Sequence, residues 1–235
     1  MLLNLINDLN IVPNDTGPIY QETMMGRLPV EPFNTISNLV FLFVIIYFSI
    51  RVYKNPKQHL FLAFSLPILS IGFIGGTLFH GTRSHQIWLF MDWVPIMILC
   101  MSAVFYFIFK LYKIWWKRVL AFILIFGVSF GVRMLPMPSV VRISLGYVIT
   151  AITVLLPIVL YLIKTKGRHK EMIILAFMFF AIAVSFRSAD KFWETDFLYM
   201  GTHWLWHLFG GMSVFFLMLY TYRDNLKQST AFTKS

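Results

Sequence analysis

Seven apolar stretches of roughly membrane-spanning length constrain the fold of this chain more than any other feature. A helix of about 20 mostly apolar residues crosses the hydrocarbon core of a bilayer and satisfies its backbone hydrogen bonds internally. The composition agrees, because 13% of the 235 residues are charged, against about 25% in soluble domains. The sequence therefore predicts an all-α polytopic membrane protein with seven transmembrane helices. They are expected at about 35–52, 59–79, 87–109, 119–135, 141–163, 172–186 and 199–222.

The distribution of basic residues predicts the orientation of these helices. The formal net charge is +10, but the lysines and arginines form short clusters after the first, third, fifth and seventh stretches instead of one patch. Such clusters are typical of cytoplasmic loops and not of a nucleic-acid site. We therefore expect an extracytoplasmic cap over 1–34, a membrane domain over 35–222 and a cytoplasmic tail over 223–235. No secretory or retention signal is recognisable, which favours a bacterial-type cell membrane.

Polar residues within the apolar stretches indicate a metal site. His203 and His207 stand four apart in the last stretch, so a helix places them on one face. They could instead face the lipid headgroups. His80 ends the second stretch and Asp92 lies near the start of the third, and the predicted topology brings all four residues to one depth in the outer leaflet. His85, the competitor of His80, is expected to be solvated in its loop.

The chemistry of these residues favours catalytic zinc. The chain has a single cysteine, so any metal must be held by His, Asp or Glu. Three neutral imidazoles and one open position are typical of a catalytic zinc site, in which the metal lowers the pKa of a bound water to about 7. Asp92 fits beside them as a general base. The alternative for Asp92 is an ion pair with Arg83 or Arg187 that joins two helices. For Arg187 and Asp190, at the outer end of the sixth stretch, the sequence predicts an ion pair that tethers helices.

The same residues resemble those of the alkaline ceramidases, which belong to a superfamily of seven-span membrane hydrolases with the adiponectin receptors and the GPI-anchor lipid remodelling factors. The resemblance covers nearly the whole chain in order and spacing. It implies that His80, His203 and His207 bind zinc and that Asp92 engages the attacking water. The motifs that carry it are Glu31-Pro-Phe-Asn34-Thr-Ile-Ser37-Asn38, Phe79-His80, Asp92-Trp-Val-Pro95 and His203-x-x-x-His207.

Two positions depart from the family pattern. Where the family places a serine that helps to stabilise the oxyanion, this chain has Gly76. Thr77 could supply a hydroxyl, although it points about 100° further round an ideal helix, or a water could take the role. The resemblance also implies a calcium site in the cap, with Glu31 the best match and Glu22 a looser one. Asp15, Asn14 or backbone carbonyls could complete its oxygens, and a solvated cap is the alternative.

Three functions remain open from the sequence. The leading hypothesis is a zinc-dependent amidohydrolase within the membrane that cleaves a ceramide-like lipid to a sphingoid base and a fatty acid; this substrate comes from the resemblance alone. A zinc-dependent esterase, or a hydrolase that remodels GPI-anchored or glycerolipids, would use the same site. A non-catalytic seven-span receptor or scaffold with structural zinc is the third hypothesis. The sequence predicts a membrane lipid as the partner and does not predict the oligomeric state.

Overall fold

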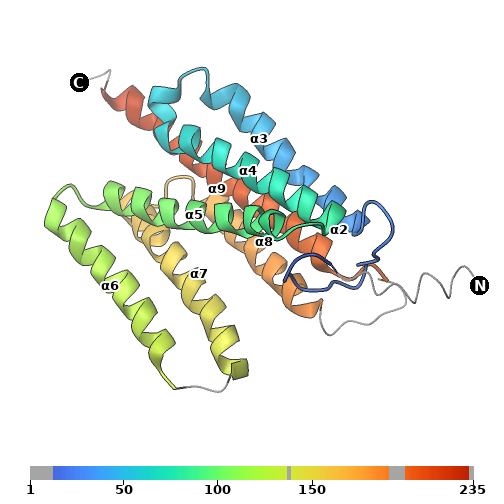
Figure 1. The fold of residues 1–235 in the computed structure, drawn as a ribbon. Coiled ribbons are helices and arrows are strands. Elements are labelled where there is room, and N and C mark those ends of the chain that lie inside the picture. Colours follow the sequence, from blue (N-terminus) through green and yellow to red (C-terminus); the bar gives the residue numbers. More distant parts are fainter. Residues whose placement is uncertain (1–12, 137–138, 191–198, 233–235) are drawn as a thin grey trace, which may run out of the picture. The chain divides into compact units, whose positions relative to one another are not determined.

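The computed structural model describes residues 13–136, 139–190 and 199–232, and every regular element within these ranges is helical (Figure 1). The chain forms two compact units. The first unit contains Met1–Ile96 and Glu171–Ser235, and the second contains Met97–Lys170. The loop 191–198, whose charges entered the orientation prediction, lies outside the described residues.

The helices confirm the predicted all-α membrane fold. Among the described residues, six segments are long and apolar enough to cross a membrane, and α7 adds the shorter apolar segment Ala151–Lys164. The predicted boundaries agree with the observed ones within a few residues, except that α9 ends ten residues beyond the predicted 222. The elements are α2 (Pro32–Ser37), α3 (Leu39–Val52), the 3-10 helix η1 (Pro56–His59), α4 (Leu60–Thr82), α5 (Gln86–Leu111), α6 (Trp115–Met134), α7 (Ser139–Lys164), α8 (Lys170–Ala189) and α9 (His203–Phe232).

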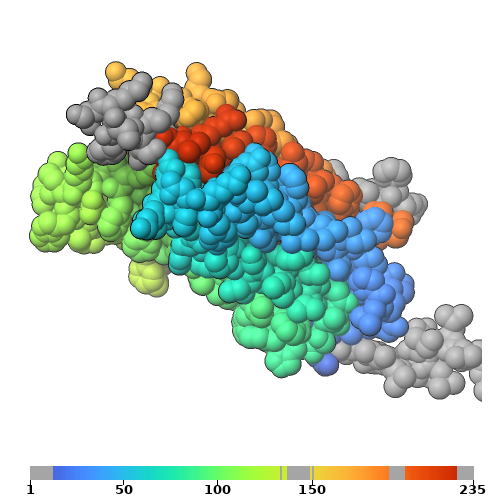
Figure 2. Space-filling model, turned by 90° about the horizontal axis from the view of Figure 1, so that it is seen from above, coloured from blue at the N-terminus to red at the C-terminus, as the bar shows by residue number. Residues whose placement is uncertain are grey.

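The first unit is built on contacts among α2, α3, α4 and α9 (Figure 1). Figure 2 shows α3 and α4 side by side on one face, with α9 next to them. Small residues allow these close approaches, as is usual between membrane helices. A side chain at Gly211 of α9 would collide with Val40 of α3, and one at Gly75 of α4 would collide with Met91 of α5.

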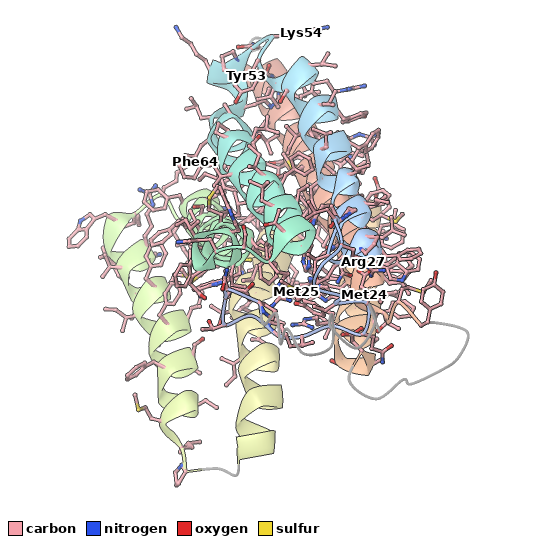
Figure 3. All side chains as sticks on the ribbon, turned by 45° about the vertical axis from the view of Figure 1, so that its right-hand side comes forward. Met24, Met25, Arg27, Tyr53, Lys54 and Phe64 are labelled. Atoms are coloured by element: carbon pink, nitrogen blue, oxygen red, sulfur yellow. The ribbon has the colours of Figure 1, made fainter. Side chains whose placement is uncertain are left out.

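The cap residues 13–31 close the end of α4 that carries His80. The last carbonyls of a helix have no partner within the helix, and the cap supplies three backbone donors to them. These hydrogen bonds run from Asn14 N to Arg83 O (3.0 Å), from Val30 N to Gly81 O (2.9 Å) and from Glu31 N to His80 O (3.0 Å). Figure 3 shows the cap residues Met24, Met25 and Arg27 at one end of α3, and Tyr53 and Lys54 at the other.

The last helix begins four residues later than the start of the predicted stretch, at His203 instead of 199. Gly201 adopts a positive φ of 72°, which breaks the helix before this point. Asp190, just after α8, then caps the new helix. Its Oδ1 accepts hydrogen bonds from the backbone N–H groups of Thr202 (2.8 Å) and His203 (3.0 Å). This cap fixes the position at which the first histidine of α9 enters the unit.

The second unit contains most of α5 together with α6 and α7. α6 packs against α7, and the hydroxyls of Ser129 and Thr153 lie 2.5 Å apart between them. An apolar groove of about 440 Å³ lies along the same pair of helices, between residues such as Val128 and Ile152. Within the described residues, this unit holds no group of three metal-binding side chains.

Candidate metal centre

Three histidines meet at one end of the first unit. His80 lies in the last turn of α4, and His203 and His207 lie in the first two turns of α9. Each offers a nitrogen within 4.8 Å of the others, and all three are buried. The ring centroids of His203 and His207 are 4.6 Å apart, and that of His80 is 5.3 and 4.9 Å from them. The predicted convergence of these residues is therefore present in the structure.

Partners behind two of the rings select the nitrogens that remain for a metal. His80 Nδ1 lies 2.5 Å from a carboxylate oxygen of Glu31. His207 Nδ1 lies 3.1 Å from the carbonyl of Asn34 and 2.8 Å from the Ser37 hydroxyl. A carbonyl or carboxylate oxygen can only accept, so Nδ1 of each ring donates and Nε2 keeps its lone pair. A histidine that binds a metal usually donates its other ring N–H to such an acceptor, which fixes the orientation and tautomer of the ring.

The buried nitrogens without partners fit a metal ion. His80 Nε2 and His203 Nδ1 are both buried, and neither has a hydrogen-bond partner among the described residues. A buried polar atom left unpaired costs about 1–3 kcal/mol, which a shared ligand would remove. Neutral imidazoles at closely spaced positions suit zinc. The donor set therefore fits a zinc ion held by these three histidines.

The His203 ring is held by stacking, and its Nδ1 has no hydrogen-bond partner in the described part of the chain. The Tyr20 ring from the cap lies over it, with centroids 4.0 Å apart and an interplanar angle of 20°. Burial raises the pKa of the Tyr20 phenol, which therefore stays neutral. The Arg187 guanidinium lies 5.4 Å from the centre of the same ring. No ion pair between Arg187 and Asp190 occurs in the described part of the chain, so the tether suggested by the sequence is replaced by this contact and by the helix cap.

Asp92 of α5 approaches the centre next to Gly76 of α4. A Cβ atom added at Gly76 would lie 2.5 Å from Asp92 Oδ1 and 3.3 Å from the side-chain amide of Asn38. The ion pair with Arg83 that the sequence left open is absent from the described residues, because Arg83 binds Asp15 and Glu31 instead. Gly76 thus leaves the room in which the Asp92 carboxylate sits.

A family comparison agrees with this arrangement. The model of the ceramidase family matches residues 24–233. The chain belongs to the ceramidase family. The matched segment contains the three histidines and Asp92, and it supports a ceramide-hydrolysing activity in general terms. A search of curated proteins found no match to the chain.

Two other residues that the sequence singled out, His85 and Thr77, have different surroundings from the three histidines. His85 is exposed, and its Nδ1 accepts a hydrogen bond from Ile87 N (3.0 Å) at the start of α5. It therefore lies outside the centre, as expected. The Thr77 hydroxyl is buried without a hydrogen-bond partner among the described residues. Its catalytic role remains a prediction.

The two acids considered for calcium have their carboxylate oxygens occupied by protein groups. The Glu22 oxygens accept hydrogen bonds from the backbone N–H groups of Phe33 (2.8 Å) and Asn34 (2.6 Å) in the first turn of α2. The Glu31 oxygens are shared by the side chains of Thr23, Asn34, His80 and Arg83. Calcium requires six to eight oxygens that are open to the ion, so these residues do not fit it.

The sequence assigned no role to several residues that position the centre. Asn34 and Ser37 were known only as part of a family motif, and Tyr20 only as a loose match to one. Asn38, which lies beside Gly76, is 2% exposed and donates to the Asn34 carbonyl (3.2 Å). A signal in the sequence could have identified three of these residues. Asn34, Ser37 and Asn38 are polar residues spaced on one helix face at the start of an apolar stretch.

Proposed function

We propose that this ceramidase is a zinc-dependent amide hydrolase of the membrane, which cleaves a ceramide-like lipid to a sphingoid base and a fatty acid. The observation that carries the proposal is the convergence of three buried imidazoles in a chain of this family. Two of them present a nitrogen that is buried and unpaired. Such a cluster has no evident structural purpose without a ligand.

In this proposal His80, His203 and His207 would hold the ion. Bound there, zinc would make a water molecule nucleophilic near neutral pH and polarise the amide carbonyl. Glu31 and the Asn34 carbonyl keep two of the rings in the required tautomer. Tyr20 excludes water from the outer face of His203, since its buried ring lies directly on the imidazole.

Asp92 moves the proton in the proposed reaction. It accepts one proton from the attacking water, whose oxygen bonds to the acyl carbon, and it returns that proton to the amine nitrogen as the C–N bond breaks. The products are a free carboxylic acid and an amine. Thr77 remains our candidate for stabilising the oxyanion, and the Asn38 amide is a further donor beside Asp92.

The lipid is proposed to enter sideways from the outer leaflet, where its amide lies just below the headgroups. An apolar groove of about 500 Å³ runs beside Ser37, the residue whose hydroxyl contacts His207. We assign it to one hydrocarbon chain of the substrate. Its lining consists of Phe33, Ile36, Ser37, Leu39, Val40, Phe43, Trp204 and Leu208.

Incubation of the purified protein with defined lipids tests this function. An N-acyl sphingoid base should release fatty acid and long-chain base, and a zinc chelator should stop the release. A matched ester of the same chain length separates an amidase from an esterase, because only an esterase would prefer the ester. If the native protein retains zinc but cleaves neither lipid, the non-catalytic alternative is correct.

A further inference from the structure

Arg83, the residue after α4, is a completely buried cation with all of its hydrogen-bond donors engaged. Its side chain is 0% exposed. Nε and Nη2 bind the two oxygens of Asp15 (2.9 and 2.7 Å), and Nη1 binds Oε1 of Glu31 (2.6 Å). The carbonyls of Pro18 (3.0 Å) and Gly17 (3.3 Å) accept the other two bonds. An arginine has five N–H donors, so this cap is a complete oxygen shell around a guanidinium.

The same cap connects Arg83 to the metal centre through one carboxylate. Glu31 Oε1 accepts from Arg83, and Oε2 lies 2.5 Å from His80 Nδ1. Thr23 and Asn34 donate to the same two oxygens (2.6 and 3.2 Å). Glu31 is therefore held by hydrogen bonds from both sides, and it links Arg83 directly to His80.

The backbone at Arg83 indicates that the side chain is required at this place. Its φ and ψ are 48° and 31°, the left-handed conformation that ends many helices. Glycine is the usual residue there, since a side chain is disfavoured in this region. An arginine persists in it when the surrounding contacts determine its position. Here the contacts are the two carboxylates and the Phe79 ring, whose centre is 4.6 Å from the guanidinium carbon.

We propose that Arg83 is an internal cation that takes the place of a calcium ion in the cap, and that it acts as a positioning residue for His80 through Glu31. The proposal has two consequences. The cap needs no divalent ion, and loss of the guanidinium weakens metal binding at a centre that Arg83 does not touch. The proposal rests on the proposed metal centre, although its first consequence, that the cap binds no calcium, can be tested without zinc.

The first experiment measures zinc affinity by chelator competition on the metal-free, full-length protein. Arg83→Gln should weaken zinc binding several-fold, by less than the roughly 10- to 100-fold usual for loss of a direct partner of a ligating histidine, because Arg83 acts through Glu31. Arg83→Lys should recover part of this loss, because it restores the charge without the planar fork. The matched control is Arg27→Gln, since Arg27 also lies in the cap but donates only to the backbone carbonyls of Val30 and Glu22.

Folding of each variant is monitored by helical circular dichroism. If Arg83→Gln does not fold, Asp15→Asn replaces it, since this variant removes a partner of Arg83 and leaves Glu31 and His80 intact. It should weaken zinc binding by a few-fold. Native zinc affinity in the folded Arg83→Gln variant, or in Asp15→Asn where the first does not fold, would overturn the positioning role.

The second experiment titrates calcium into the native protein. Neither bound calcium nor a calcium-dependent rise in the thermal midpoint is expected, and stoichiometric calcium binding would overturn the internal-cation proposal. His203→Ala provides the separation from the proposed function. If this variant keeps its zinc, the metal centre itself is wrong, whereas normal loss of zinc in His203→Ala with no effect of Arg83→Gln rejects only the role of Arg83.

Discussion

Buried histidines lie next to other rings near both ends of α4, and the two ends differ in what surrounds the rings. At one end His80 meets His203 and His207. At the other, His59 stacks on Tyr222 with centroids 4.4 Å apart and an interplanar angle of 17°. The histidines are buried at both ends, and His59 Nδ1 also has no hydrogen-bond partner among the described residues. Burial of a histidine is therefore not sufficient to indicate a metal site.

The difference lies in convergence and in the groups behind the rings. Three imidazoles share one space at the first end, and Nδ1 of two of them points to an acceptor that frees Nε2. Among the described residues, no second histidine joins His59 in a metal-binding group. Its ring has the contacts of a packed aromatic residue. Variants that change one end only can test whether the metal binds at the end of His80 and not at the end of His59.

The largest effect is expected for His203→Ala. Loss of a partner behind a ligand usually costs about 10- to 100-fold in metal affinity, so removal of a ligand itself should cost more than about 100-fold. Lipid hydrolysis should be lost with it. Metal analysis of the purified variant measures this. Zinc content equal to that of the native protein would show that His80, His203 and His207 do not form a metal site.

Asp92→Asn should separate chemistry from metal binding. The amide cannot take a proton from water, so turnover should fall by about 10²- to 10⁴-fold, while zinc content stays native. Single-turnover lipid cleavage and metal analysis on the same preparation give both values. A variant with native turnover would show that Asp92 has no part in proton transfer.

Glu31→Gln should weaken zinc binding by loosening the hold on the His80 ring. Zinc affinity is expected to fall by about 10- to 100-fold, because the amide no longer accepts from His80 as a charged oxygen. The variant also leaves the buried Arg83 with one carboxylate, Asp15, and should unfold at a lower temperature. Chelator competition and thermal unfolding in detergent measure the two effects, and an unchanged zinc affinity would contradict the link between Glu31 and the metal.

Gly76→Ala is expected to have a smaller effect, limited to catalysis. The added Cβ would lie 2.5 Å from Asp92 Oδ1, so the carboxylate must move. A displacement of 1 Å can cost about 100-fold, and a smaller shift should lower turnover by about tenfold without loss of zinc. Native turnover in this variant would mean that the position of Asp92 beside α4 is not critical.

The smallest functional effect is expected for His59→Ala. Zinc affinity and turnover should both remain native, since the ring lies at the other end of α4. Stability should fall by about 1–2 kcal/mol through the lost stack on Tyr222 and the space left behind, which a thermal midpoint in detergent reports. A loss of zinc in this variant would erase the distinction between the two ends.

Much of the fold and the core of the site followed from the sequence. Apolar length identified the helices, and the ends of those helices predicted that His80 and His203 would meet, because both depend on local periodicity and the thickness of a bilayer. The orientation in the membrane and the identity of the metal stay predictions. The start of α9 was harder to predict from the sequence, since it depends on Gly201 and on a cap from Asp190, which directly follows α8.

The partners of the acids could not be predicted in the same way. Arg83 was considered as a partner of Asp92, yet it binds Asp15 and Glu31. Charge and spacing allow all of these pairs equally. The choice between them depends on how the cap folds over the last turn of α4, and no periodic pattern in the sequence records that path.

The distribution of the three histidines along the chain has a consequence for biosynthesis. His80 is made before its two neighbours, which belong to α9 and follow it by more than 120 residues. The centre therefore cannot assemble until α9 has been synthesised. A product that ends before this helix has one imidazole where three are needed, so it should bind no metal at this place.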